Sequence, residues 1–286
     1  MNTDPNLLNT DPNLSVYNAP GVAEYYAGLT YLTPCERLLF DAYLKPGMAI
    51  LDLGVGGGRT ATDLSSIAGK YVGVDYAPEM IAACRRKFPQ LDFEVGNASD
   101  LSRFGSANFD AVVMAFNGID YLPTDEARAC ALREIHRVLK LNGILIFSSH
   151  NPRSILVRPS WNRQRLLEFA QKLVGVRFAA SPLLLEAFKV LRGALAGAQS
   201  GWLSLARFTR RVPTAAFWRG HGYSMDSAHG GLRTHRAIPK QVVREVNSSG
   251  FRILRIVGDD YPRQSNRFIT DWFYYVFSKT VAPGEK

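Results

Sequence analysis

Glycines at alternate positions, with an acid just before them, could hold a nucleotide. In the stretch LDLGVGGG, Asp52 precedes glycines at positions 54, 56 and 58. Glycine permits positive φ angles and lets the backbone approach a ligand closely. A second acid, Asp75, ends the apolar stretch YVGVD, and a carboxylate at that place can accept both hydroxyl groups of a ribose. We therefore predict that Asp52, Gly54, Gly56, Gly58 and Asp75 surround one nucleotide-like ligand.

The spacing of the glycines separates two kinds of nucleotide. The dinucleotide fingerprint G-x-G-x-x-G, counted from Gly54, requires a third glycine where this chain has Arg59. That fingerprint places a pyrophosphate on a helix N-terminus. The pattern acid-x-G-x-G-x-G fits from Asp52 to Gly58, and it resembles motif I of the class I S-adenosylmethionine-dependent methyltransferases. The ligand of that family has no phosphate, and its ammonium and sulfonium groups favour a carboxylate such as that of Asp52.

Four more stretches resemble this family, in the same order along the chain. They are YAPEM at 76–80, GNASDL at 96–101, NFDAVVMAFNGIDYL at 108–122 and REIHRVLKLNGILIFS at 133–148. The resemblance implies S-adenosylmethionine as the cofactor, with contacts from Tyr25, Tyr76, Met80, Asn97, Ala98 and Phe116. Many relatives have Asp at the position of Asn97, and an Asn carbonyl can accept the same hydrogen bond from the adenine amino group.

The acceptor of the methyl group is expected at the ends of the fourth and fifth strands. The loop FNGIDYL contributes Asn117 and Tyr121, because residues of this loop face the acceptor in the family it resembles. Asn151 follows the fifth strand, at the edge where ligands bind in open α/β sheets. The reaction would be an in-line displacement at the sulfonium methyl, in which orientation of the two reactants can contribute about 7–11 kcal/mol.

A histidine could take the proton from an oxygen or nitrogen acceptor, because its pKa lies near neutrality. His150, His229 and His235 are the candidate bases. The three histidines between positions 218 and 239 are spaced by eight and six residues. That spacing matches no known set of metal ligands, so we expect no metal.

These residues must be positioned by strands that end at one edge of a sheet. Apolar stretches at 49–53, 71–75, 91–95, 110–116 and 144–149 alternate with helical patterns. Such alternation predicts a parallel sheet covered on both faces. A helix over 239–248 and strands over 251–257 and 271–279 fit the reversed last strand of the methyltransferase family. We predict an α/β fold: a Rossmann-like, seven-stranded, mostly parallel sheet with helices on both faces and a helical insertion after strand five.

Residues 151–236 interrupt the alternation and are strongly basic. They carry a net charge of +11, whereas the rest of the chain carries −2. Three interpretations remain open: a helical lid with a solvated basic face, a lid that binds an anionic acceptor, or a surface that meets anionic lipid and presents a lipid-linked acceptor. The basic residues form no single run and no recognition motif, so nucleic acid is not expected as a partner.

The predicted organisation has four parts. Residues 1–18 repeat the sequence NTDPNL and are predicted to be a flexible tail. Residues 19–150 form the cofactor-binding core with its N-terminal helices, 151–236 the basic acceptor lid, and 237–286 the completion of the sheet. Because the chain lacks a signal peptide and paired cysteine spacing, we expect a cytoplasmic protein, with peripheral membrane contact as an alternative. The oligomeric state is not determined by the sequence.

The predicted function is methyl transfer from S-adenosylmethionine to an oxygen or nitrogen of a small-molecule acceptor, anionic or lipid-linked. Two alternatives remain. The first is an NAD(P)-dependent oxidoreductase, which Arg59 and the missing third glycine oppose. The second is a protein that binds S-adenosylmethionine without catalysis, because one fold hosts many functions.

Overall fold

The computed structural model describes residues 12–158, 182–226 and 231–281. Three helices precede the sheet: α1 (Pro12–Tyr17), α2 (Val22–Ala27) and α3 (Pro34–Tyr43). The first half of the core contains β1 (Met48–Leu53), α4 (Ala61–Ile67), β2 (Ala68–Asp75), α5 (Pro78–Lys87), β3 (Asp92–Val95) and β4 (Phe109–Met114). It continues with the 3-10 helix η2 (Gly118–Tyr121), α6 (Asp125–Val138) and β5 (Leu139–His150).

The second half of the chain holds the insertion and the end of the core. The insertion contains α8 (Pro182–Arg211), α9 (Ala215–Arg219) and a hairpin of β6 (His221–Asp226) and β7 (Leu232–Ala237). The core closes with α10 (Pro239–Ser248), β8 (Phe251–Gly258) and β9 (Trp272–Lys279). The helix predicted over 239–248 is confirmed.

The seven core strands form one sheet in the order β3-β2-β1-β4-β5-β9-β8. β1 pairs in parallel with both β2 and β4, and β4 pairs in parallel with β5. β9 runs antiparallel to its neighbours β5 and β8. The strand order reverses at β1, and ligands of open α/β sheets bind at such a switch point, beyond the carboxyl ends of the strands. The predicted seven-stranded, mostly parallel sheet with a reversed last strand is confirmed.

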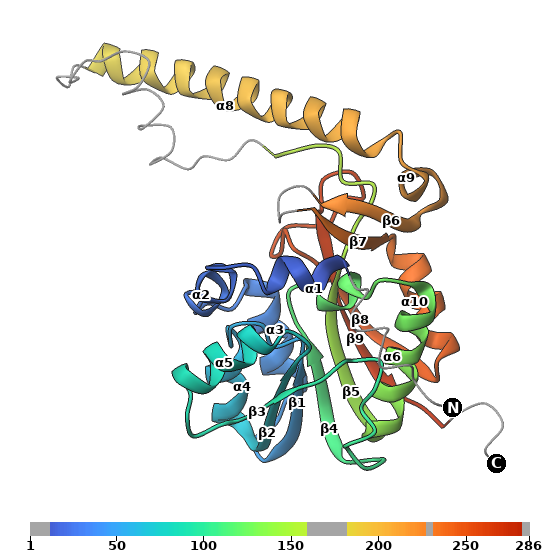
Figure 1. Ribbon diagram of the computed structural model, residues 1–286. Coiled ribbons are helices and arrows are strands. Elements are labelled where there is room, and N and C mark those ends of the chain that lie inside the picture. Colours follow the sequence, from blue (N-terminus) through green and yellow to red (C-terminus); the bar gives the residue numbers. More distant parts are fainter. Residues whose placement is uncertain (1–11, 159–181, 227–230, 282–286) are drawn as a thin grey trace.

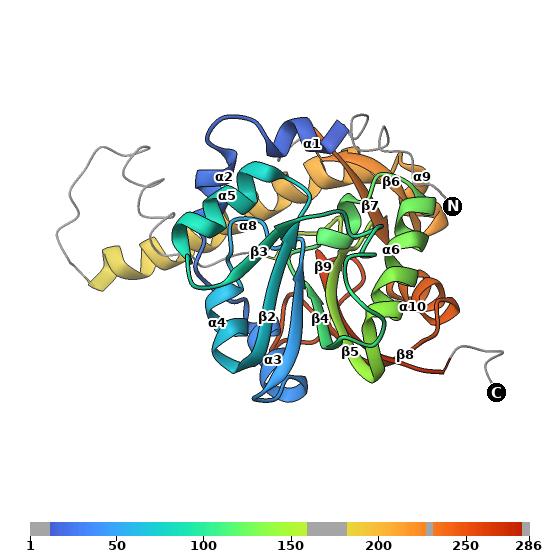
Figure 2. The same cartoon turned by 60° about the horizontal axis from the view of Figure 1, so that its bottom comes forward.

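Helices cover both faces of the sheet. In Figures 1 and 2, α3, α4 and α5 lie on one face, and α6 and α10 lie on the other. Alternate residues of β1 feed the two cores: Leu51 and Leu53 pack with the α6 and α10 side, and Ile50 packs with the α3, α4 and α5 side. This alternation follows from the period of two along a strand, and it accounts for the near-continuous apolar stretches of the central strands.

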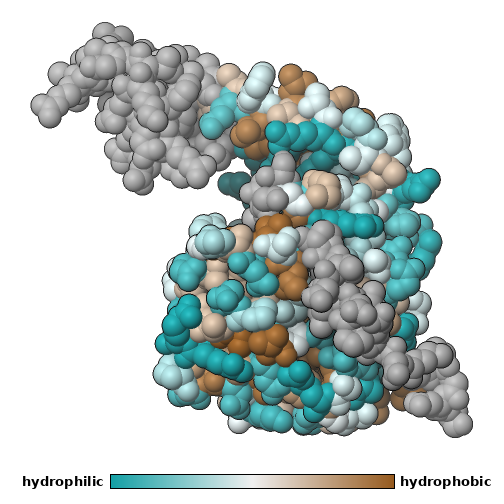
Figure 3. Space-filling model, in the orientation of Figure 1, coloured by the Kyte–Doolittle hydropathy of each residue, from teal (hydrophilic) through white to brown (hydrophobic). Residues whose placement is uncertain are grey.

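The insertion is less purely helical than its sequence predicted. Helix α8 lies above the carboxyl ends of the strands and extends beyond the body of the molecule (Figure 1). The stretch predicted as a loop between residues 218 and 239 instead contains the β6–β7 hairpin, with Tyr223 paired to His235. Apolar residues lie exposed on the part of the surface that the insertion forms (Figure 3). Within the described residues, no helix has both the length and the apolar character to cross a membrane.

The N-terminal segment is also more ordered than predicted. Residues 12–17 form α1, although the sequence indicated a flexible tail over 1–18. Asn13 is buried, and its amide donates to the carbonyl oxygens of Tyr121 and Arg233 at 3.1 and 2.9 Å. It also accepts from the backbone N–H of Arg233 at 2.8 Å. These partners lie more than 100 residues away, so a local pattern could not predict them.

Candidate active site

A cavity of about 470 Å³ opens at the carboxyl edge of the sheet, beside β1 and β4. That volume is in the range of small-molecule and cofactor sites. Its walls come from the loops after β1, β2, β3 and β4 and from α1, α2 and the ends of β5 and β9. Among its lining residues are the predicted Gly54, Gly56, Asp75, Tyr76, Met80, Asn97, Ala98, Phe116, Asn117, Tyr121 and His150.

The glycine loop follows β1 and bends sharply. Gly54, Gly56 and Gly58 all have positive φ, at 71°, 54° and 80°, which explains their spacing. Gly57, which the sequence interpretation passed over, is required for another reason. A Cβ atom there would lie 2.2 Å from the backbone nitrogen of Ala27 in α2. The loop is therefore packed directly beneath α2, and Gly57 lines the cavity while Gly58 does not.

Asp75 stands at the end of β2 and holds the glycine loop. Its Oδ2 accepts from the backbone N–H of Gly56 at 2.8 Å, and its Oδ1 accepts from that of Ala77 at 2.9 Å. Each carboxylate oxygen retains a further lone pair for a ligand hydroxyl. Burial raises the pKa of Asp75 to about 6, although the hydrogen bonds from the backbone oppose that shift. This arrangement suits the ribose of a nucleoside.

Asp52 lies beneath the glycine loop, outside the lining of the cavity. Its Oδ2 accepts from the Thr60 hydroxyl at 2.6 Å and from the Tyr71 hydroxyl at 2.9 Å. Burial raises the pKa of Asp52 to about 6. The carboxylate thus supports Thr60, which lines the cavity, and its predicted contact with the ligand, direct or through water, stays a prediction.

Arg59, which the sequence used only as evidence against a dinucleotide, ties the glycine loop to α3. Its guanidinium contacts both carboxylate oxygens of Glu36, at 2.8 and 2.5 Å, and both side chains are buried. Glu36 also accepts from the backbone of Thr33 in a capping box at the start of α3. The Arg59 carbon Cζ lies 4.8 Å from the centre of the Phe116 ring. The charge of Arg59 is thus neutralised within the protein.

The side of the cavity nearest β2 and β3 matches the adenosine contacts implied by the family resemblance. Tyr76, Met80, Asn97 and Ala98 all line it. The Asn97 side chain accepts from the backbone N–H of Ser99 at 2.9 Å, which orients its amide.

Tyr25, a predicted cofactor contact, does not line the cavity in this structure. Its side chain is 64% exposed, and Tyr26 lines the cavity in its place, together with Tyr17 of α1. Successive residues of a helix point about 100° apart, so only one of the two adjacent tyrosines of α2 can face the cavity. The sequence pattern alone did not show which one.

The loop after β4 forms the other side of the cavity with a strained backbone. Phe116 and Asn117 have positive φ angles of 55° and 62°. Such conformations are uncommon for residues with a Cβ, and they cluster at functional sites. The Asn117 backbone N–H donates to the Ser148 hydroxyl at 2.8 Å. The Tyr121 ring stands edge-on to the rings of Tyr17 and His150.

Among the histidines that the structure describes, His150 is the one that lines the cavity. It ends β5, and its Nε2 lies 3.3 Å from the Asn117 amide nitrogen. Its Nδ1 lies 2.9 Å from Oδ2 of Asp120. The Asp120 carboxylate therefore holds one ring nitrogen while the other faces the loop that lines the cavity. This is the geometry of a histidine that can accept a proton from a ligand.

Two other predicted acceptor-side residues, His235 and Asn151, are not among the residues that line the cavity. His235 of β7 is buried, and its Nδ1 is 3.9 Å from Oδ1 of Asp120. The side chain of Asn151 donates to the carbonyl oxygens of Arg267 and Thr270 at 2.8 Å, so it fixes the loop between β8 and β9. The predicted acceptor contact of Asn151 has no support from this arrangement and stays a prediction. His229 lies outside the residues that the structure describes.

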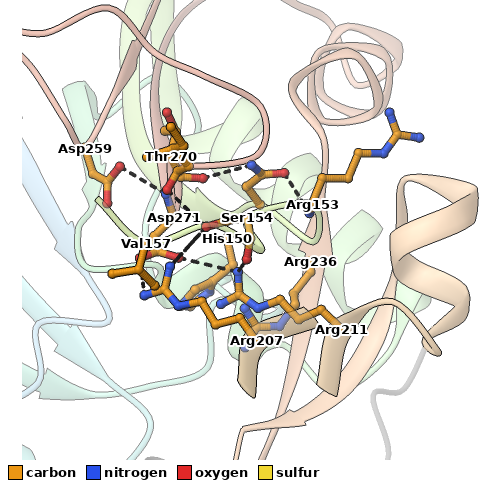
Figure 4. A network of polar contacts seen from close by, with 12 residues as sticks. His150, Arg153, Ser154, Val157, Arg207, Arg211, Arg236, Asp259, Thr270 and Asp271 are labelled. Carbon is orange, nitrogen blue, oxygen red and sulfur yellow. Dashed lines mark hydrogen bonds and ion pairs between the residues drawn. The ribbon is translucent and has the colours of Figure 1, made fainter. Parts of the chain in front are cut away.

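One acidic residue, Asp271, connects α8 of the insertion to the cavity wall. Asp271 immediately precedes Trp272, which lines the cavity. Its carboxylate forms an ion pair with Arg207 of α8 at 2.8 Å and a longer one with Arg211 at 3.4 Å. It also accepts from the Ser154 hydroxyl at 2.7 Å (Figure 4). The sequence pattern gave no signal for this cluster, whose members come from three separate segments.

Across the described part of the chain, no cluster of three or more His, Cys, Asp and Glu side chains could hold a metal ion.

Comparisons with known proteins agree with the arrangement of the site. Residues 50–143 match the family described as "Methyltransferase domain". The chain is 36% identical over 95 residues to a demethylmenaquinone methyltransferase of Chlorobaculum parvum, covering 33% of this chain and 37% of that protein. It is 30% identical over 127 residues to a ubiquinone biosynthesis O-methyltransferase of Xanthomonas axonopodis pv. citri, covering 42% and 51%. The chain thus spans about half or less of the length of these relatives.

A solved structure extends the similarity to the fold of nearly the whole chain. An S-adenosylmethionine-dependent methyltransferase of Methanosarcina mazei superposes with a TM-score of 0.55 at 17% identity, covering 88% of this chain and 99% of that one. At that identity the similarity concerns the fold. Residues 50–143 thus match a methyltransferase domain, and the strand order is that of the fold shared with this S-adenosylmethionine-dependent methyltransferase.

Proposed function

We propose that the protein transfers a methyl group from S-adenosylmethionine to a hydroxyl oxygen of a small aromatic acceptor, with His150 as the base. The observation that carries this proposal is the position of the His150 imidazole in the cavity wall, held by Asp120 on one side. The glycine cradle and the Asp75 carboxylate fit the nucleoside, because they provide close backbone approach and acceptors for ribose hydroxyls.

The chain's own residues provide the proton transfer and the alignment. Bound S-adenosylmethionine supplies an electrophilic methyl group and a neutral thioether leaving group. The acceptor oxygen forms the new bond to the methyl carbon as the carbon–sulfur bond breaks, and the hydroxyl proton passes to Nε2 of His150. General base catalysis of this kind contributes typically 10²–10⁴-fold. The neutral leaving group needs no Lewis acid.

The cavity favours an uncharged, planar acceptor. Its acceptor side is formed by the rings of Tyr17, Phe116, Tyr121 and Trp272. Arg59, the arginine among the lining residues that the structure describes, is paired with Glu36, so it is not available to a carboxylate or phosphate. This observation argues against the anionic acceptor that the basic insertion suggested. Relatives named for demethylmenaquinone and ubiquinone biosynthesis support an aromatic acceptor.

Two measurements test the proposed function. Calorimetry with S-adenosylmethionine, S-adenosylhomocysteine and NAD should show binding of the first two ligands and not of NAD. Transfer of a labelled methyl group is then measured with a panel of phenols, benzoates and aliphatic amines. His150→Gln should lower transfer to phenols about 10²–10⁴-fold with S-adenosylhomocysteine affinity unchanged.

His136→Gln is the matched control, because His136 lies on α6 and contacts the Thr280 carbonyl, away from the cavity. It should transfer methyl groups at the parental rate. Binding of NAD in preference to S-adenosylmethionine, or undiminished turnover by His150→Gln, would contradict the proposal.

We further propose that the insertion contacts anionic membrane surfaces. Trp202, Leu205 and Phe208 recur every third residue of α8, so they share one side of the helix, and they are 71%, 56% and 49% exposed. Exposed Arg210 and Arg219 lie nearby in sequence. Exposed aromatic and leucine residues beside arginines are typical of interfacial helices, and each arginine near an anionic surface contributes about 1 kcal/mol. A membrane surface would deliver a lipid-linked acceptor to the cavity edge.

Vesicle flotation tests this contact. The full chain should float with phosphatidylglycerol vesicles at low salt, less at high salt, and not with phosphatidylcholine alone. Trp202→Ser with Phe208→Ser should reduce flotation. Leu141→Ser should not, because Leu141 is similarly exposed at 57% but lies on β5, outside the insertion. The proposal would be overturned if the chain stayed in solution with anionic vesicles. It would also be overturned if light scattering gave the mass of a dimer and the substitutions in α8 returned the chain to a monomer.

A further inference from the structure

Asp120 is a buried acid that contacts Nδ1 of His150, the proposed base. It belongs to η2, the short helix after β4, and its side chain is fully buried. A buried carboxylate must be paired or hydrogen-bonded to remain charged. The partners of Asp120 therefore identify the groups that stabilise its ionised carboxylate.

Both oxygens of the carboxylate are occupied by donors. Oδ2 accepts from the backbone N–H of His150 at 2.6 Å and contacts its Nδ1 at 2.9 Å. Oδ1 accepts from the Ser149 hydroxyl at 2.8 Å. Burial opposes ionisation, but the hydrogen bond from His150 and the positive charge of Arg128 hold the pKa of Asp120 well below its usual range. An ionised carboxylate is only an acceptor.

The carboxylate is itself held by an ion network that reaches α10. Arg128 of α6 lies 3.6 Å from Oδ1 of Asp120. The guanidinium donates to both carboxylate oxygens of Glu245 at 3.0 and 2.9 Å and to the carbonyl of Ile119 at 2.6 Å. Arg128 is fully buried, so Asp120 is fixed by the core of the domain. Other titratable neighbours are His235 of β7, at 3.9 Å, Tyr275 of β9 and Tyr121 of the same η2 segment.

The geometry dictates which ring nitrogen of His150 carries the proton. Because the Asp120 carboxylate can only accept, the Nδ1 that faces it must carry a hydrogen. In the neutral imidazole the lone pair is then on Nε2, which faces Asn117 and the cavity. The contact between Nε2 and the Asn117 amide nitrogen is long, at 3.3 Å, so a hydroxyl could compete for Nε2. The opposite tautomer would direct an N–H at the acceptor, and His150 could not take a proton.

We propose that Asp120 is a positioning residue that fixes the Nδ1–H tautomer of His150 and so prepares Nε2 as the proton acceptor. This inference rests on the proposed function for its purpose, but its geometry concerns the unliganded protein. Asp120 touches neither the acceptor nor the cofactor, since it does not line the cavity. Its effect is exerted through the imidazole alone.

Nitrogen-15 NMR of the full chain, labelled at histidine, tests the tautomer directly. The signals of His150 are assigned by their loss in His150→Gln, and spectra are taken above neutral pH with and without S-adenosylhomocysteine. We expect a protonated Nδ1 and an unprotonated Nε2 in the parent. In Asp120→Ala the proton should be shared between the two nitrogens. Asp110→Asn should leave the tautomer unchanged, because Asp110 pairs with Lys140, away from His150.

A protonated Nε2 in the parent protein would overturn the inference, and so would an unaltered tautomer in Asp120→Ala. If Asp120→Ala does not fold, as circular dichroism would show, the parental spectrum alone decides. Failure of the proposed function would be seen separately, as a lack of S-adenosylhomocysteine binding or methyl transfer with the tautomer as expected. A wrong tautomer with normal cofactor binding would reject the inference alone.

Discussion

At the scale of single residues, the glycine loop combines two separate constraints. Three of its glycines adopt positive φ, whereas Gly57 is required because α2 crosses directly over it. The first constraint is local and produces the spacing that is visible in the sequence. The second depends on a contact between segments about thirty residues apart, and it brings Tyr26 of α2 to the cavity.

Gly57→Ala should therefore weaken the site. The new methyl group overlaps the backbone of Ala27, so α2 must shift, at a cost of about 1–3 kcal/mol typical of overpacking. We expect S-adenosylhomocysteine to bind at least about tenfold more weakly in calorimetry, since 1.4 kcal/mol corresponds to a factor of ten. Gly105→Ala is the control, because nothing lies within 4 Å of its Cβ position. Equal effects of the two substitutions would contradict this account.

The pH dependence of cofactor binding should report on Asp75. Burial raises its pKa to about 6, and ribose hydroxyls donate to its ionised form. Protonation therefore competes with binding, and affinity is full above pH 6 and lost as the pH falls below it. The dissociation constant of S-adenosylhomocysteine should rise by up to about tenfold per pH unit between pH 6 and 5. In Asp75→Asn, binding should be weaker and should no longer depend on pH in this range. If the dissociation constant of this variant still rose between pH 6 and 5, the pH dependence would belong to another group.

At the scale of elements, the buried Arg59–Glu36 pair joins the glycine loop to α3. Removing one partner of a buried ion pair typically costs about 3–5 kcal/mol, because the other charge is left uncompensated. Glu36→Gln should therefore lower the free energy of unfolding by about that amount in denaturant titrations. Glu94→Gln breaks the exposed pair with Arg103 and should change the free energy of unfolding by less than about 1 kcal/mol. Similar changes in the free energy of unfolding for the two variants would show that the Arg59–Glu36 pair does not stabilise the fold.

At the scale of the whole molecule, the insertion is held near the cavity by Asp271. This carboxylate accepts two arginines of α8 at the position next to Trp272 in the cavity wall. A displacement of α8 would therefore act on Asp271, which is adjacent in sequence to Trp272 of the cavity wall. The structure thus links the basic segment to the cavity by position, even though its arginines do not enter the cavity.

Hydrogen exchange should show this attachment. In Asp271→Asn, amides of residues 200–211 should exchange at least about fivefold faster, which corresponds to the loss of roughly 1 kcal/mol. Amides of the central strands should keep their protection. Asp92→Asn, an exposed acid on the edge strand β3, should leave the exchange of α8 unchanged. Unaltered exchange of α8 in Asp271→Asn would show that other contacts hold the insertion.

The sequence by itself determined the sheet, and it predicted residues for the cofactor end of the site. The alternation of apolar stretches with helical patterns and the glycine spacing are local properties, because they follow from backbone geometry over a few residues. They were sufficient to predict the seven strands, and they directed attention to Gly54, Gly56, Asp75, Tyr76 and Met80, which line the cavity.

Only the tertiary structure decided which polar residues meet. It showed that Tyr26 and His150 line the cavity, whereas Tyr25 and His235 do not. It also showed that the Asn151 side chain holds the loop between β8 and β9. It also gave Arg59 a partner 23 residues away and brought Asp120 to His150 across 30 residues. Such pairings depend on which elements pack together. They also depend on the direction of each side chain, which differs between adjacent positions of a helix or strand. For that reason the sequence indicated S-adenosylmethionine, while the proposals for the base, its orienting acid and the acceptor side of the cavity came from the packing.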